Sequence, residues 1–311
     1  MDFFTTTKNN LRESTKRTYR ISIRRLYRGL NQDRFLKVHE DGDKQSVDSL
    51  DFLSDADLVV DYLEQFMPNT RKSYLNAIIV LLKSQTGDPI PALKTYEKLR
   101  DGYNTAYQDE MATGNKTEKQ KSQWVEWDSY LKMIKQMYAD VKSRKLRRKK
   151  ELDSVDLRLF GDLVLCELYA AFPLRNDFAG VKVMTQREYK KLGDTEQNIL
   201  VKTPMRFILN SYKTDKTYGK KEYPIQGKLK NLIVDWLKVN TTGELLINMT
   251  ANGITKALNR ITKTRLGKAV GSSMLRHSYL SSKYADSESE KEKDADKMGH
   301  STSTQKLYIK K

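Results

Sequence analysis

Residues 156–178 read DLRLFGDLVLCELYAAFPLRNDF, and this strongly apolar stretch predicts a buried helix that ends before Pro173. A helix that is apolar on most of its faces belongs inside a packed core. Cys166 lies within the run, where we expect a core position rather than a reactive thiol, and a single cysteine excludes an internal disulfide. Arg175 follows the break directly. It is therefore either a surface residue at a helix start or a functional group that the core holds rigidly.

The stretches around this helix predict a domain that is mainly helical with a small sheet. Short runs rich in β-branched and aromatic residues, separated by polar turns, predict three strands, and 214–221 is the turn of the last hairpin. These strands are expected over 198–202, 205–213 and 221–225. Helical periodicity predicts four more helices, over 124–141, 228–239, 254–264 and 273–285. The expected fold class is mainly α with a small antiparallel β-sheet.

The first hundred or so residues predict helices only. Residues 14–30, STKRTYRISIRRLYRGL, combine apolar residues at helical spacing with basic residues on the other faces, and Ser14 can cap the helix start. Three further helices are expected over 55–66, from about Thr70 to before Gly87, and after Pro91. Residues 111–123 are polar and contain Gly114, which favours an interdomain linker. The predicted organisation is a helical domain over 1–110, a linker over 111–123 and a second domain over 124–311.

The chain is strongly basic. Its 311 residues include 57 Lys+Arg against 40 Asp+Glu, a formal net charge of +17. An excess of this size points to a polyanionic partner, most often nucleic acid, and a generally basic solvated surface is the alternative. The cations are clustered, which favours nucleic acid. We expect the N-terminal helices to contact DNA phosphates through Lys16, Arg17, Arg20, Arg24, Arg71 and Lys72.

Several functional classes find no support in the sequence. The first residues lack a basic region followed by an apolar stretch, so no signal peptide is expected, and no apolar run is long enough to cross a bilayer. We therefore expect a reducing compartment, cytoplasm or nucleus. His39, His277 and His300 show no metal-ligand spacing, and no Gly-rich phosphate loop of the Walker type occurs. The expected chemistry uses neither a cofactor nor a metal.

Two C-terminal segments combine charged and polar residues that suit phosphate chemistry. In LRHSYLSS (275–282), Arg276 lies beside apolar residues, where an unpaired guanidinium is costly and needs a carboxylate or a bound phosphate as its partner. In MGHSTSTQKLY (298–308), His300 precedes Tyr308 by eight positions in a polar segment. The order of arginine, Arg-His, Gly-His and tyrosine along the chain favours a functional role for residues that singly would be interpreted as structural.

The segments FPLRNDF, LRHSYLSS and MGHSTSTQKLY, together with a lysine on the predicted hairpin, resemble the conserved boxes of the tyrosine recombinases, the phage-integrase family. The resemblance is strongest to the variants of eukaryotic mobile elements and large DNA viruses. It covers the chain from about Trp124 to the end, and the N-terminal helices resemble the core-binding domain of the family more loosely. The resemblance implies a catalytic domain over 124–311 and a DNA-gripping core-binding domain over 1–110.

The resemblance also implies a role for each site residue. Tyr308 would attack a DNA phosphodiester to give a 3′-phosphotyrosyl link and a free 5′-hydroxyl. Arg175 and Arg276 would hold the non-bridging oxygens, His300 would add a hydrogen bond, and Lys213 would protonate the leaving oxygen. The residue types suit this chemistry, because an arginine fork matches phosphate in two places and a cationic site favours the tyrosinate. The phosphotyrosine bond keeps the energy of the phosphodiester, so rejoining needs no ATP.

Two positions depart from the family pattern or leave a choice open. The family usually has a histidine three residues before the second arginine, where this chain has Ser273. A serine hydroxyl can donate to a phosphate oxygen but cannot act as a general base as an imidazole does. Lys213 matches the family lysine best by its Lys-Thr context, and Lys216 in the turn is the second choice. His277 is expected to be structural, since one step along a helix turns it away from Arg276.

The expected activity is site-specific DNA recombination, in the sense of integration, excision or resolution, by a homotetramer on double-stranded DNA. Free chains are expected to be monomeric or weakly associated. The alternative is a type IB topoisomerase-like enzyme, which uses a tyrosine nucleophile with arginine and lysine in the same way but works as a monomer. The non-enzymatic alternative is a degenerate relative that only binds DNA, and Ser273 in place of the usual histidine would indicate the loss of catalysis. A protein of this kind is expected in the cytoplasm, the host nucleus or a viral factory, and not outside the cell.

Overall fold

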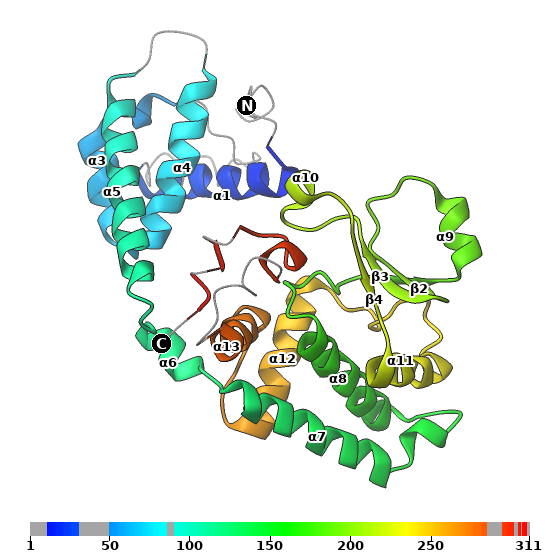
Figure 1. Cartoon of the computed structure of the whole chain (residues 1–311). Helices are drawn as coiled ribbons and strands as arrows, with labels where there is room; N and C mark the ends of the chain where they lie inside the picture. The colour runs from blue at the N-terminus through cyan, green and yellow to red at the C-terminus, as the bar shows by residue number, and fades with distance from the viewer. Residues whose placement is uncertain are drawn as a thin grey trace, which may run out of the picture. The chain divides into compact units, whose positions relative to one another are not determined.

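The computed structural model describes residues 11–30, 50–85, 90–284, 294–301, 304–305 and 307–309. The chain divides into two compact units, Met1–Met111 and Ala112–Lys311, each with a hydrophobic core cluster of its own (Figure 1). The division falls at the start of the polar stretch 111–123. His39 lies outside the described residues.

The first unit is built from helices throughout its described residues. These are α1 (Glu13–Leu30), η1 (Asp51–Leu53), α3 (Ala56–Glu64), α4 (Pro68–Ser84) and α5 (Ala92–Ala112). Asp55 caps α3 by accepting a hydrogen bond from the Leu58 backbone N–H at 3.0 Å. Helix α4 begins at Pro68, two residues before the expected start near Thr70. The fixed φ angle of proline suits a first helical turn, and its missing N–H would find no partner there in any case.

The second unit contains most of the helices. They are α6 (Glu118–Gln123), α7 (Trp127–Ser143), η2 (Leu146–Arg148), α8 (Ser154–Ala171), α9 (Gln186–Leu192), α10 (Asp215–Tyr218), α11 (Gly227–Val239), α12 (Ala251–Leu266) and α13 (Ser272–Tyr284). The stretch predicted as a linker is thus partly helical. Thr117 and Gln120 form a reciprocal capping box that starts α6, a local signal that the polar composition of the stretch conceals.

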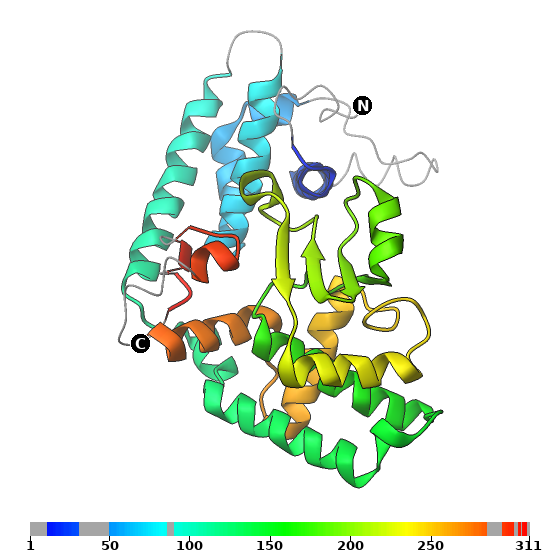
Figure 2. The ribbon, with the colours of Figure 1, turned by 45° about the vertical axis from the view of Figure 1, so that its right-hand side comes forward.

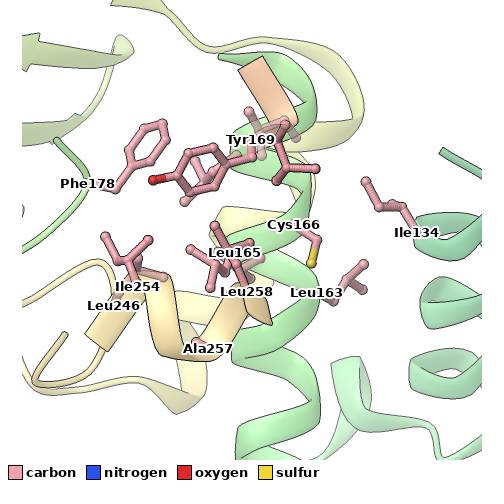
Figure 3. Packing of buried hydrophobic residues seen from close by; sticks show 14 of the residues in the cluster. Ile134, Leu163, Leu165, Cys166, Tyr169, Phe178, Leu246, Ile254, Ala257 and Leu258 are labelled. Carbon is pink, nitrogen blue, oxygen red and sulfur yellow. The ribbon is translucent and has the colours of Figure 1, made fainter. Parts of the chain in front are cut away.

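Helix α8 is the centre of the second unit, as its apolar sequence predicts. It packs against α7, α11 and α12, and its buried face carries Cys166 and Tyr169 among aliphatic side chains (Figure 3). The Tyr169 and Phe178 rings meet edge to face, with centroids 5.2 Å apart. Burial raises the pKa of Cys166 to about 12, so its thiol stays protonated and unreactive. The rigid end of this helix is the platform from which the Arg175 segment starts.

The sheet has four strands in the order β1–β2–β3–β4, and it is mixed rather than antiparallel (Figure 2). The strands are β1 (Lys182–Met184), β2 (Ile199–Lys202), β3 (Met205–Leu209) and β4 (Lys221–Pro224). Strands β2, β3 and β4 pair antiparallel, as predicted, but β1 pairs parallel with β2. The expectation of an antiparallel sheet is therefore wrong at this edge. The chain between β1 and β2 passes through α9, and such a crossover brings two strands side by side in parallel.

Asn198, at the start of β2, connects the segment after Arg175 to the loop after β3. Its amide nitrogen donates to the backbone oxygens of Asp177 at 3.2 Å and Ser211 at 2.9 Å. Its amide oxygen accepts from the backbone N–H groups of Asn210 and Ser211, both at 2.9 Å. Both donor hydrogens and both acceptor sites of this buried amide are therefore used in hydrogen bonds that hold the two loops at a fixed separation.

Replacing Asn198 by alanine should lower the free energy of unfolding by about 2–3 kcal/mol, because it leaves backbone groups of both loops without their partners. Urea unfolding followed by circular dichroism measures the loss. Asn252→Ala, at an exposed position of α12, is the matched control and should stay within about 0.5 kcal/mol of the parent. An equal effect of the two substitutions would contradict the connecting role of Asn198.

Candidate functional site

Arg276 is a charged side chain inside the second unit. It lies on α13 and is only 3% exposed. Its Nε atom donates to the backbone oxygen of Pro173 at 3.0 Å, whereas its Nη2 atom is buried with no hydrogen-bond partner. Burial lowers the pKa of the Arg276 guanidinium, yet an arginine stays charged at neutral pH. The side chain is thus fixed to the end of the Pro173 break and keeps one buried donor group available.

The Gly-His segment forms a helix end that directs His300 inward. Residues 294–297 are helical, Gly299 follows with a φ of +64°, and the His300 N–H donates to the Ala295 carbonyl at 3.0 Å. The Gly299 N–H donates to Asp296, which completes a Schellman motif. The left-handed conformation favours glycine at this position.

The β3–β4 hairpin forms hydrogen bonds with this helix end. Thr214 Oγ1 donates to the Gly299 carbonyl at 2.5 Å, and Lys221 Nζ donates to the Asp296 carbonyl at 2.7 Å. The Tyr223 hydroxyl donates to the Lys297 carbonyl. A Cβ on Gly299 would come within 2.9 Å of the Tyr212 ring, so the contact leaves no room for a side chain. The hairpin loop that carries Lys213 is therefore tied to the residue next to His300.

Tyr308 packs against α13 of its own chain. His277 Nδ1 donates to the Tyr308 carbonyl at 2.7 Å, and the two rings have centroids 4.9 Å apart. The His300 ring stacks on Tyr308 with centroids 5.6 Å apart, and the Arg276 guanidinium carbon lies 5.4 Å from the Tyr308 ring centroid. The structure thus brings Arg276, His300 and Tyr308 together. His277 was expected to turn away from Arg276. It instead contacts Tyr308 and holds the tyrosine segment.

Gln305 is a member of this site that sequence reasoning missed. It is fully buried, and neither its amide nitrogen nor its amide oxygen has a hydrogen-bond partner. Its carbonyl accepts from the Tyr308 N–H at 2.9 Å, so the two residues share one turn. Gln305 lies within the segment MGHSTSTQKLY that carries the resemblance, three residues before Tyr308, and this spacing could have marked it as a neighbour of the tyrosine.

Arg175 lies at the same end of the unit, partly buried. The Tyr169 hydroxyl donates to the Arg175 carbonyl at 2.9 Å, which fixes the backbone of the segment to α8. Burial raises the pKa of Asp177, and the positive charges of Arg276 and Arg175 act against that rise. The positive charges of both arginines also lower the pKa of His300. Arg175 therefore belongs electrostatically to the site around Tyr308.

The remaining predicted site residues lie at its edge. Lys213 is exposed in the loop between β3 and α10, next to Thr214, and Lys216 is exposed in α10. Ser273 is exposed in the first turn of α13, whereas Arg276, one turn further on, is buried. The choice between Lys213 and Lys216 stays open, but Lys213 is adjacent to the residue that contacts Gly299.

The predicted DNA-contacting residues of the first unit are held in different ways. Arg17 and Arg24 are exposed on α1, while Lys16 and Arg20 pair with Glu13 at 2.8 and 3.7 Å. Lys72 Nζ lies 4.6 Å from the Tyr107 ring centroid. Arg71 donates to the carbonyls of Phe66 and Glu64 and to the Tyr103 hydroxyl, so it closes the end of α3. Its guanidinium is already engaged inside the unit.

Comparison with protein-family models, with curated proteins and with solved structures found no match. None of the helices in the described ranges is long and apolar enough to span a membrane. Within the same ranges, no three or more His, Cys, Asp or Glu side chains gather in a way that could hold a metal ion. Interpretation of the site therefore rests on its own geometry.

Burial lowers the pKa of His300 to about 4, and the positive charges of Arg276 and Arg175 add to this effect. The ring is neutral at pH 7. Its Nδ1 atom faces the Ser301 carbonyl at 3.3 Å, which can only accept, so Nδ1 carries the proton. The Nε2 atom then holds a lone pair, and it is buried without a partner. The site thus contains a neutral imidazole next to a tyrosine.

The lowered pKa of His300 makes folding sensitive to acid. An unfolded histidine has a pKa near ~6.5, so as the pH falls from about 6.5 to about 4 the unfolded chain binds a proton that the folded chain excludes. Stability should fall through this window, by about 2 kcal/mol at pH 5 relative to pH 7 from this group. Urea unfolding of the parent and of His300→Gln at both pH values measures it. Equal pH dependence of the two proteins would contradict the buried neutral imidazole.

Proposed function

We propose that the protein cleaves and rejoins DNA strands through a covalent link to Tyr308, as a site-specific recombinase that resembles the tyrosine recombinases. The observation that carries this proposal is a pair of buried polar atoms beside Tyr308 that have no hydrogen-bond partner among the described residues. These are Nη2 of Arg276, a donor, and Nε2 of His300, an acceptor, and both residues pack against the Tyr308 ring. Buried polar groups are normally hydrogen-bonded, so unmatched ones favour a binding site. The oxygens and negative charge of a phosphodiester match Nη2, and the Tyr308 hydroxyl proton matches Nε2.

The charge of the site selects an anion. Arg276 is nearly fully buried, and Arg175 contributes a second positive charge. Asp177 interacts with both arginines electrostatically, but no ion pair joins it to Arg276 among the described residues. A buried charge that lacks a close counter-ion is strongly unfavourable, so an anionic ligand stabilises the site as it binds. The Arg276 donor and the His300 base are fixed before the ligand arrives, because Pro173 holds Arg276 and the helix end at Gly299 holds His300. A preorganised donor such as Arg276 stabilises the added charge of a pentavalent phosphorus.

In the proposed reaction the Tyr308 hydroxyl oxygen attacks phosphorus and forms the Tyr–O–P bond. The bond from phosphorus to the 5′ oxygen of the next nucleotide breaks. The tyrosine proton passes to Nε2 of His300, which is unprotonated at neutral pH, and the leaving oxygen takes a proton from Lys213. This assignment gives His300 the role of base that Ser273 has no group to fill. Rejoining is the same sequence in reverse, with a 5′-hydroxyl as nucleophile.

The contact between the β3–β4 hairpin and the segment that carries His300 supports the role of Lys213. Thr214, its neighbour, contacts Gly299, so the lysine loop and the His300–Tyr308 segment are positioned by one set of contacts. The packing of Tyr308 on His277 and Arg276 of the same chain supports attack by a tyrosine on the phosphate bound by its own chain.

The finer features of the proposal concern assembly. We infer that the first unit is a core-binding domain that binds double-stranded DNA, and that Arg17 and Arg24, which are exposed on α1, contact its phosphates. Two duplexes and four chains would form the active complex, in the cytoplasm or nucleus.

A nicked suicide duplex with randomised sequence tests the chemistry. Cleavage beside the nick releases a short fragment and traps the covalent adduct, which a denaturing gel detects. The parent should give an adduct, and Tyr308→Phe should give none, because it lacks the attacking oxygen. Tyr279→Phe is the matched control, since Tyr279 lies in the same apolar cluster as Tyr308 and should retain the adduct. An adduct with Tyr308→Phe, or none with the parent across the pool, would contradict the proposal.

Mixing two inactive chains tests which chain supplies the tyrosine. A Tyr308→Phe chain keeps its phosphate site, and an Arg276→Gln chain keeps its tyrosine. Attack within one chain predicts no adduct from the mixture. Recovery of an adduct would show that the tail acts in a neighbouring chain.

A further inference from the structure

A basic hollow lies at the end of α8 that is remote from Arg175. It is formed by the C-terminal part of α7, the η2 turn and α11, and has a volume of about 690 Å³. The residues lining it are Tyr138, Ala139, Val141, Lys142, Lys145, Arg147, Arg148 and Asp235. Figure 1 shows the loop between α7 and α8 at this end of the second unit. None of the residues assigned to the proposed reaction lines it.

The segment 142–150 carries more positive charge than its acidic neighbours neutralise. Arg144 and Lys149 pair with Asp156 at 3.1 and 2.7 Å, and Arg147 pairs with Asp235. Among the described residues, no ion pair forms with the other cations of the segment. These exposed cations are Lys142, Lys145, Arg148 and Lys150. Three of the four line the hollow.

The cations are presented by a loop with a fixed conformation. Leu146 is fully buried in the core of the unit and anchors the loop. Lys145 has a φ of +54°, in the left-handed region that normally favours glycine. The Lys145 N–H donates to Lys142 at 3.0 Å, and the Arg148 N–H donates to Lys145 at 3.0 Å. The loop therefore holds a lysine at a position where glycine would be easier to accommodate, and its backbone does not need ordering on binding.

The hollow is separate from the site around Tyr308. The segment 142–150 pairs with Asp156 in the first turn of α8, whereas Arg175 follows the last turn. An α-helix of 18 residues is about 27 Å long, so a ligand in the hollow is not the phosphate held by Arg276.

We propose that this basic hollow binds the phosphate backbone of nucleic acid, as a second contact for a DNA segment outside the cleavage site. A protein partner is less suited. Four of its eight lining residues are cations, whereas the core of a protein–protein interface is depleted of charged residues. A phosphate backbone needs only cations held at a surface, and Lys142, Lys145 and Arg148 supply them.

Lysine footprinting on the full chain tests this proposal. The Tyr308→Phe protein is acetylated with and without a short duplex of random sequence, and peptide mass spectrometry measures each lysine. The duplex should slow acetylation of Lys142 and Lys145 several-fold at low salt, and high salt should remove the protection. Cleavage is not required, so this result is independent of the proposed reaction. Unchanged acetylation of both lysines would overturn the proposal.

Salt-dependent affinity gives a second readout. A triple variant, Lys142→Gln, Lys145→Gln and Arg148→Gln, should lower the slope of log K against log salt by about 2.7, about 0.9 for each lost phosphate contact. The control changes the same number of exposed cations on α9, with Arg187→Gln, Lys190→Gln and Lys191→Gln, and should leave the slope nearly unchanged. Equal slopes for the two variants would overturn the proposal. So would protection of Lys142 and Lys145 by a polyglutamate at equal charge concentration, which would assign the hollow to an acidic protein.

Discussion

The buried guanidinium of Arg276 is the constraint on which the architecture of the site depends. A charged group at 3% exposure is stable only when its donors are occupied. The Pro173 break supplies one acceptor, and it can do so because α8 ends there and leaves a backbone carbonyl outside a helix. The second group, Nη2, has no hydrogen-bond partner among the described residues. The fold thus satisfies this guanidinium in part, and the proposed anion would satisfy the rest.

The other elements of the unit position groups around that guanidinium. Helix α13 carries both Arg276 and His277, so the residue proposed to bind the anion and the residue that holds the Tyr308 carbonyl share one rigid element. The sheet contributes at a distance, because Asn198 fixes the hairpin loop to the segment after Arg175, and Thr214 fixes that loop to Gly299. A substitution in the hairpin therefore acts on His300 without contacting it.

The sequence predicted the main helices of the second unit, because the pattern that indicates a helix depends only on neighbouring residues. The apolar pattern of α8 and the periodicity of α7, α11, α12 and α13 depend on neighbouring residues only, and the structure agrees with them. Strand β1 was not predicted at all, because three residues are too few to show the alternation that marks a strand. Gln305 was missed because burial of an amide depends on the tail folding back onto α13. The contact of His277 with Tyr308 was missed for the same reason, since the two residues are 31 positions apart in the chain.

Titration of His300 tests most directly the claim that its site is built for a phosphate. Proton NMR of the imidazole, assigned with His300→Gln, gives its pKa with and without inorganic vanadate, a phosphate-like oxyanion that can become five-coordinate when it binds a further oxygen. Burial among positive charges holds that pKa near about 4 in the free protein. A bound anion offsets those charges, so the pKa should rise by about 1–3 units, and Arg276→Gln should abolish the rise. A pKa that vanadate leaves unchanged would contradict the account.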